Sequence, residues 1–245
     1  MLLLLTTLCA VALGQSHDEW QRVLDKHRSN AGRVDYQNIG QNKDLADYLH
    51  SLSSHAEPTP RSERLAFWIN AYNALTVKLV VDHWPIASIK ELDDGQVWDK
   101  RKFTVANQQL TLNQIEREKL KPLREPRVHV ALNCASLGCP PLYKDAFVAE
   151  SIEQQLHDAT SAWVSSSGIE IDEKSQHLKL STLFDWYGPD FIVSDDVTIS
   201  GVKSKLQGPV LWVGQYTTQK QKEWLLRGNY TISFIPYSWD INATD

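Results

Sequence analysis

Two cysteines five positions apart carry the chemistry that the sequence suggests most directly. Cys134 and Cys139 flank the stretch Ala-Ser-Leu-Gly, and Cys9 is the only other cysteine of the chain. Residues 128–132 alternate between apolar and other side chains, which predicts a half-buried strand that carries His129 and ends just before Cys134. A sulfur pair at a strand end can form a disulfide, supply a thiol nucleophile or contribute to a metal site. The residues alone leave these alternatives open.

A thiol nucleophile requires a base or a positive field, because an unperturbed cysteine has a pKa near 8.5. Five residues of extended strand would place His129 about 16 Å from Cys134, with the two side chains on opposite faces. Glu116 is a second candidate base, since burial in a short apolar helix would raise the pKa of its carboxyl group. A structural alternative pairs Glu116 with Arg117 or Arg127. The candidate catalytic residues are therefore Cys134, Glu116 and His129.

The disulfide alternative is equally concrete. Bridging Cys134 and Cys139 requires Cα atoms about 4.4–6.8 Å apart, and the four residues between them can form the necessary turn. A loop this short removes little chain entropy, so such a bond would mainly shape the segment locally. A metal site is disfavoured, because no second Cys/His pair follows at zinc-finger spacing. We expect neither a metal nor a cofactor.

The longest helical pattern covers residues 64–83 and is apolar nearly all round, which predicts a buried central helix that Pro85 ends. Asn70 and Asn73 lie three positions apart and share a face of this helix. Buried amides need partners, so the two side chains either hold loops in place or face a site. Trp68 of the same helix is one of nine tryptophans, which can fill a core or line a groove. Asn70, Asn73 and Trp68 are the candidate binding residues.

The remaining patterns predict a fold of the α+β class, a mainly helical single domain with a small, largely antiparallel sheet. The Thr111–Gln114 capping box marks the start of a short helix. Residues 183–191 form an aromatic-rich turn. Further helices are predicted over residues 18–27, 45–52, 149–164 and 217–227, and strands over residues 102–105, 169–171, 177–180 and 230–235.

The N-terminus begins with an apolar run that ends in Ala-Leu-Gly, which predicts a signal peptide over residues 1–14 and a secreted or periplasmic protein. The mature chain is predicted to consist of a helical segment over residues 15–60 and a main domain over residues 61–242. We expect no integral membrane segment after cleavage, because the run is shorter than the roughly 20 residues that span a bilayer. A net charge of -5, without a basic cluster interleaved with aromatics, argues against a nucleic-acid partner.

Several segments together resemble the family of unknown function catalogued as DUF547. They are Phe67-Trp68-Ile69-Asn70-Ala71-Tyr72-Asn73-Ala74-Leu75, residues 112–116, 129–141 and 180–191, and Phe234-Ile235-Pro236-Tyr237. The resemblance spans residues 32–242 and implies an α+β domain of the kind found in exported bacterial proteins and in plant proteins. It implies no known activity. The chain departs from the family pattern at Arg117, where Ile-Glu is commonly followed by histidine, and plant members carry serine at the position of Cys139.

Two functions remain open. The first is an exported thiol-dependent hydrolase or transferase that acts on an amide or peptide-like substrate, either a small molecule or a peptide. The alternative is a non-catalytic exported binding domain with a structural Cys134–Cys139 disulfide. For the first, we predict that Cys134 rather than Cys139 faces the pocket, near Glu116.

Overall fold

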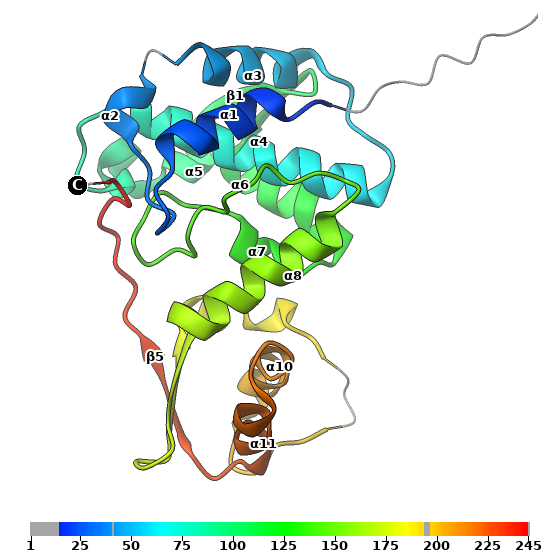
Figure 1. Ribbon diagram of the computed structural model, residues 1–245, viewed down its shortest axis with the longest axis vertical. Helices are drawn as coiled ribbons and strands as arrows, with labels where there is room; N and C mark the ends of the chain where they lie inside the picture. Colours follow the sequence, from blue (N-terminus) through cyan, green and yellow to red (C-terminus); the bar gives the residue numbers. More distant parts are fainter. Residues whose placement is uncertain (1–14, 41, 194–196, 245) are drawn as a thin grey trace, which may run out of the picture.

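The computed structural model describes residues 15–40, 42–193 and 197–244, so the predicted signal peptide lies outside the described part of the chain. Helices surround α4 (Arg61–Val81) in one part of the molecule (Figure 1). In the other part, α10 (Ser204–Val213) and α11 (Gln219–Arg227) lie beside a three-stranded sheet, and α8 (Ile152–Trp163) runs between the two parts. Each part has its own cluster of buried apolar side chains. The chain is a mainly helical α+β domain, as its sequence predicts.

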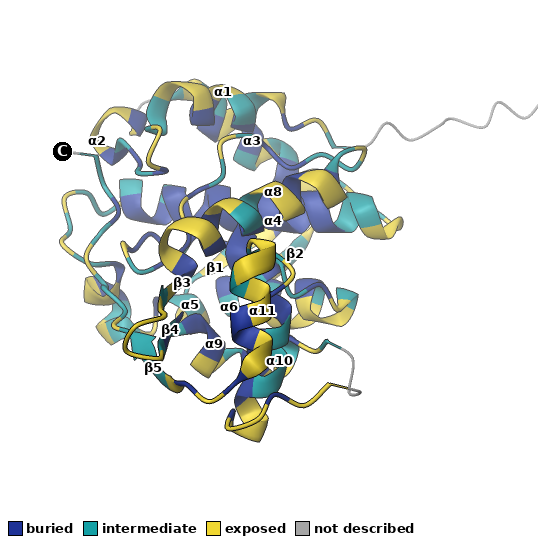
Figure 2. Ribbon diagram, turned by 60° about the horizontal axis from the view of Figure 1, so that its bottom comes forward, coloured by how far each residue is buried: buried dark blue, intermediate teal, exposed yellow. Residues whose placement is uncertain are grey.

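The central helix is α4. The consecutive residues Phe67, Trp68, Ile69 and Asn70 point in different directions from its axis, yet each is 0% exposed. A helix that is apolar on all sides is stable only when other elements surround it. The helices α1 (Asp18–His27), α2 (Tyr36–Ile39) and α3 (Lys43–Ser54) pack over it, and Figure 2 shows α4 dark beneath the partly exposed α1.

The other helical elements are short, and most of them contribute buried side chains to the two apolar clusters. Within the described residues, no helix combines the length and apolar character needed to cross a membrane. The short helical elements are η1 (Ile89–Gly95), α5 (Val97–Lys100), α6 (Leu112–Gln114), η2 (Ile115–Leu120), η3 (Lys121–Leu123), α7 (Val128–Ala131), η4 (Val164–Gly168), α9 (Leu183–Trp186) and η5 (Gly188–Asp190). The capping box of Thr111 and Gln114 is present at the start of α6, which confirms that prediction.

The strands form two small sheets. The hairpin β1 (Lys102–Val105) and β2 (Gln108–Thr111) is antiparallel, and its turn places Ala106 and Asn107 at φ of 50° and 57°. In the second sheet β3 (Ile169–Asp172) pairs antiparallel with β4 (His177–Ser181), while β5 (Thr231–Ile235) pairs with β4 in parallel. The parallel pairing brings the chain that follows β5 back to the helical part.

The predicted strand over residues 128–132 is wrong, because Val128–Ala131 forms the helical turn α7. The backbone N–H groups of Ala131 and Leu132 donate to the carbonyl oxygens of Arg127 and Val128. A short buried apolar run does not distinguish a strand from a helical turn by its periodicity. His129 and Cys134 are therefore not held on opposite faces of a strand.

Candidate functional site

The loop that carries both cysteines is held by α4. Asn73 donates from Nδ2 to the carbonyl oxygen of Ala131 at 2.9 Å and accepts from the backbone N–H of Asn133 at 2.8 Å. These two bonds fix the chain between α7 and Cys134. The prediction that Asn73 is buried with amide partners is confirmed, since its exposure is 2%.

Asn133 continues the same network across the loop to the C-terminal segment. Its Nδ2 donates to the carbonyl oxygen of Pro140 at 3.1 Å, and its Oδ1 accepts from the Ala135 N–H at 3.0 Å and from Asn242 Nδ2 at 3.1 Å. The Asn242 side chain in turn accepts from Tyr36 Oη at 2.6 Å. Fully partnered buried amides define a single geometry, so the cysteine loop is rigidly placed.

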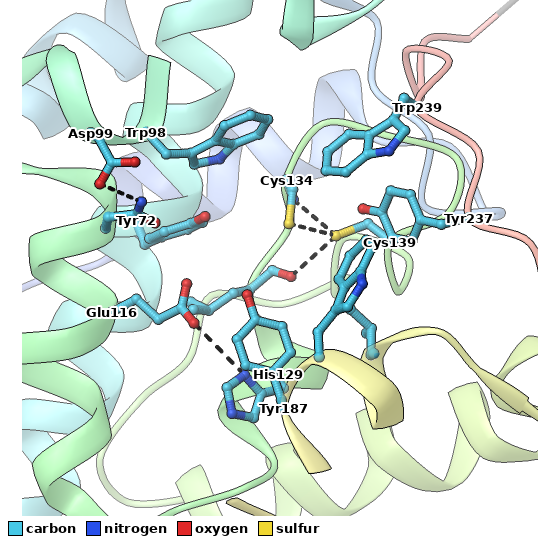
Figure 3. A pocket seen from close by; sticks show the side chains of 14 residues that line it. Tyr72, Trp98, Asp99, Glu116, His129, Cys134, Cys139, Tyr187, Tyr237 and Trp239 are labelled. Atoms are coloured by element: carbon cyan, nitrogen blue, oxygen red, sulfur yellow. Dashed lines mark hydrogen bonds and ion pairs between the residues drawn. The ribbon is translucent and has the colours of Figure 1, made fainter. Parts of the chain in front are cut away.

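The two cysteines lie side by side as free thiols. Their Sγ atoms are 3.0 Å apart, and the backbone N–H of Cys134 donates to Cys139 Sγ at 3.0 Å. Cys134 is partly exposed, whereas Cys139 is 8% exposed. Both line one cavity (Figure 3). The structure does not show the disulfide that the alternative function requires.

The surroundings of the thiols favour ionisation of Cys139 over ionisation of Cys134. Burial opposes ionisation of Cys139, but hydrogen bonds from the thiol and the backbone N–H of Cys134, and from Tyr237 and Ser136, outweigh it and lower its pKa. The pKa of Cys134 is raised by its hydrogen bond to Cys139 and then by burial. The pair therefore loses its first proton more readily than an isolated thiol.

Glu116 and His129 face the same cavity from a different direction. The His129 Nδ1 atom lies 3.9 Å from Glu116 Oε1, and His129 Nε2 is 3.0 Å from Asp190 Oδ2. Tyr187 hydrogen-bonds the Glu116 carboxyl group, and its ring stacks on the imidazole with 4.1 Å between centroids. Asp190, His129, Glu116 and Tyr187 thus form one series of contacts that ends in the cavity.

Burial sets the protonation of this series. The side chains of Glu116 and His129 are only 15% and 8% exposed. Burial raises the pKa of Glu116, against a smaller opposing effect of the Tyr187 hydrogen bond and of Arg117. Burial also lowers the pKa of His129, although the bond to Asp190 opposes this. A raised carboxyl pKa beside a lowered imidazole pKa brings the two groups closer to the range in which a side chain gives and takes a proton.

The cavity has a volume of about 290 Å³ and lies where the helical part meets the segment 183–191. Figure 3 shows Cys134 and Glu116 directed into it from opposite sides. Gly208 of α10 lets the backbone at Phe191 lie against this helix, because a Cβ atom at position 208 would be 2.3 Å from the carbonyl oxygen of Phe191. The residues that line the cavity are Tyr72, Trp98, Asp99, Asn113, Glu116, His129, Leu132, Cys134, Cys139, Leu183, Trp186, Tyr187, Tyr237 and Trp239.

The structure brings together Cys134, Glu116 and His129, but it does not place the three candidate binding residues in the cavity. Asn70 donates to the carbonyl oxygen of Phe147 at 2.7 Å and accepts from its N–H at 3.0 Å. Trp68 is fully buried and donates from Nε1 to Glu57 at 3.2 Å. Asn70 therefore holds a loop and Trp68 fills the core, while Asn73 supports the cysteine loop from behind.

Sequence reasoning missed the residues that complete the site. Tyr187 and Asp190 belong to the stretch 183–191, which the sequence marks only by its aromatic composition and by its resemblance to the family. Tyr72 lines the cavity one residue before Asn73, and burial raises the pKa of its phenol so that it remains a donor. Among the described residues, no group of three or more His, Cys, Asp or Glu side chains is arranged to hold a metal ion.

The fold and the cavity define a mainly helical α+β protein with an accessible thiol pair beside a buried carboxyl–imidazole pair. A family model described as "Protein of unknown function, DUF547" matches residues 56–164. This match over residues 56–164 supports the resemblance to the family that the sequence suggests. No curated protein and no solved structure matches the chain. Glu116, His129 and both cysteines lie inside the matched segment, whereas Tyr187 and Asp190 lie outside it.

Proposed function

We propose that this protein is an exported thiol-dependent hydrolase or transferase that acts on an amide or peptide-like substrate, with Cys134 as nucleophile. The observation that carries the proposal is the cavity itself, which is lined by Cys134, Cys139, Glu116 and His129 together. The predicted signal peptide over residues 1–14 is the basis for export to a secreted or periplasmic location.

The thiol pair supplies the nucleophile in the first half of the reaction. The proton of the Cys134 thiol passes to the Cys139 thiolate over the 3.0 Å between the sulfur atoms. Cys134 Sγ then attacks the carbonyl carbon of the substrate, and the carbonyl oxygen becomes an oxyanion. The hydroxyl groups of Tyr72 and Tyr187 line the cavity and stay protonated, so they are the candidate donors to that oxyanion.

Glu116 acts as the general acid and then as the general base in the remaining steps. Its neutral carboxyl group donates a proton to the leaving amine nitrogen as the C–N bond breaks, which leaves a thioester on Cys134 and a carboxylate on Glu116. The carboxylate next accepts a proton from a water molecule, or from the acceptor nucleophile of a transferase, as its oxygen or nitrogen attacks the thioester carbon. The C–S bond breaks, Cys134 recovers its proton from Cys139, and the starting protonation state returns.

His129 and Asp190 act as positioning residues for Glu116. Asp190 accepts the His129 Nε2 proton at 3.0 Å, which leaves Nδ1 as an acceptor 3.9 Å from Glu116. This contact favours the protonated carboxyl group before the substrate is attacked. Through the contacts of Asp190 with His129 and of His129 with Glu116, the protonation of Glu116 depends on the segment 183–191.

Acylation by p-nitrophenyl acetate tests the proposal, because its leaving group needs no general acid. We expect a burst of about one p-nitrophenol per protein molecule and an acetyl thioester on Cys134, located by peptide mass. Cys134→Ala should abolish the burst. Glu116→Gln should keep the burst and accumulate the acyl-enzyme, with the turnover that follows slower by about 10²–10⁴-fold.

The controls separate this chemistry from surface acetylation. Ser29→Ala removes a partly exposed hydroxyl group far along the chain from the cavity and should leave burst and turnover unchanged. Acetyl groups confined to lysines, or a burst that persists in Cys134→Ala, would contradict the proposal and favour a non-catalytic binding domain.

A further inference from the structure

One wall of the cavity is a continuous series of aromatic rings that come from three separate segments. Trp98 lies in α5, Trp186 in α9, and Tyr237 and Trp239 in the chain that follows β5. The ring centroids are 5.8 Å apart for Trp98 and Trp239, 4.6 Å for Trp239 and Tyr237, and 4.9 Å for Tyr237 and Trp186. The contacts of Trp98 with Trp239 and of Tyr237 with Trp186 join the three segments into one wall.

The wall is not fully covered by the protein. Trp186 is 46% exposed, although it stacks on Trp239 with 5.9 Å between ring centroids. A large indole left half exposed beside reactive groups is a surface for contact with a ligand, since the core gains nothing from its exposed face. Figure 3 shows the Trp239 and Tyr237 rings near the thiols and the Trp98 ring on the side of Glu116.

The charge of the lining complements a cation. Asp99 contributes a carboxyl group, and of the described residues no lysine or arginine lines this cavity. Asp99 is exposed at the rim and accepts a hydrogen bond from the neutral amide of Asn113 at 2.7 Å. An acidic rim above aromatic faces attracts positive charge, because the face of an indole ring carries partial negative charge.

A cation already occupies part of the same aromatic wall. Lys90 Nζ lies 4.6 Å from the ring centroid of Trp239, although Lys90 does not line the cavity. An ammonium group is therefore compatible with the ring outside the cavity, and the faces of Trp186 and Trp98 inside it have the same electronic character.

We propose that the cavity binds an ammonium group of its ligand against the Trp186–Trp239 wall, with Asp99 as the counter-charge. If the bound ligand is the substrate of the thiol site, this proposal rests on the proposed function. The substrate is then an amide that carries an ammonium group near the reacting carbonyl. Two sources present this chemistry, a lysine side chain in a peptide and a small quaternary ammonium compound.

Calorimetric titration of the Cys134→Ala protein tests the inference without any dependence on catalysis. Choline is compared with 3,3-dimethyl-1-butanol, its uncharged carbon analogue, and Nα-acetyl-lysine amide is compared with Nα-acetyl-norleucine amide. We expect at least one cation to bind about three- to tenfold more tightly than its neutral counterpart. The pair with the larger ratio identifies the source, a free quaternary ammonium compound or a lysine side chain.

Variants assign the preference to the cavity. Asp99→Asn and Trp186→Leu should each reduce the charged-to-neutral ratio several-fold. Asp94→Asn removes the same charge from an exposed position outside the cavity and should leave the ratio unchanged. Because Trp186 is half exposed, its replacement should leave the thermal unfolding temperature nearly unaltered.

Three results would overturn the inference: no binding of either cation, equal binding of a cation and its neutral analogue, or an equal effect of Asp94→Asn and Asp99→Asn. A charged-to-neutral preference together with failure of Cys134 acylation would retain the cation site and reject the thiol chemistry. The two proposals therefore fail separately.

Discussion

Asn73 hydrogen-bonds the backbone on both sides of Leu132: its Oδ1 accepts from the N–H of Asn133 at 2.8 Å, and its Nδ2 donates to the carbonyl oxygen of Ala131 at 2.9 Å. A single side chain of the central helix thus fixes the exit from α7 and the entry into the cysteine loop. The position of Cys134 in the cavity depends on a buried amide rather than on a strand.

The pair Asn70 and Asn73 provides a matched comparison. Asn70→Ala and Asn73→Ala each leave two buried backbone groups of a loop without partners, so each should lower the free energy of unfolding by about 1–3 kcal/mol in a urea titration. Only Asn73→Ala should also change the rate at which iodoacetamide labels Cys134 in the folded protein. Equal labelling rates in both variants would show that the loop does not depend on Asn73.

Cys139→Ser should raise the pH midpoint for alkylation of Cys134. The pKa of Cys139 is lowered, because its sulfur accepts hydrogen bonds from Cys134 that stabilise the thiolate form. A serine hydroxyl cannot hold that charge, so Cys134 must ionise alone in a buried site. Rates of labelling between about pH 6 and pH 10 give the midpoint, since the unperturbed thiol pKa is near 8.5. A midpoint that stays in place, or falls, would contradict the coupled pair.

Asp190→Asn should shift the acidic limb of the deacylation rate to lower pH. The charge of Asp190 raises the pKa of Glu116, so its removal lets the carboxylate form at lower pH. The turnover of p-nitrophenyl acetate after the burst reports this limb. Asp185→Asn is the control, because Asp185 pairs with Lys205 at 2.8 Å and does not line the cavity. The same shift in both variants would assign it to the general field of the protein.

His17 should make the fold sensitive to acid. Burial lowers the pKa of His17 from 6.5 to about 4, and its Nδ1 is 2.7 Å from Tyr48 Oη. Because the unfolded chain binds the proton more tightly, the contribution of His17 is fully present above about pH 6.5 and is lost as the pH falls toward 4, by about 3 kcal/mol in total. Urea titrations across this range should show a smaller slope of stability with pH for His17→Gln than for the unaltered protein. Parallel slopes would exclude His17 as the cause.

Much of the fold follows from local pattern. The all-round apolar character of α4, the Thr111–Gln114 capping box and the β3–β4 pair could be predicted because each depends on residues close together in the chain. The helix α10 could not, since Gly208 and Pro209 lie inside it and both disfavour helix in isolation. The helix α10 packs against Phe191, and this contact requires glycine at position 208, because a Cβ atom there would lie 2.3 Å from the Phe191 carbonyl oxygen.

The sequence by itself determined that Cys134, Glu116 and His129 were the residues with chemistry to offer, because their types and short spacings are local facts. Only the tertiary structure decided that they share a cavity. A helical turn replaces the expected strand at His129, and the contact of His129 with Asp190 joins positions 61 residues apart. Such contacts form when separate elements bury their apolar faces together, and no local periodicity encodes which faces will meet.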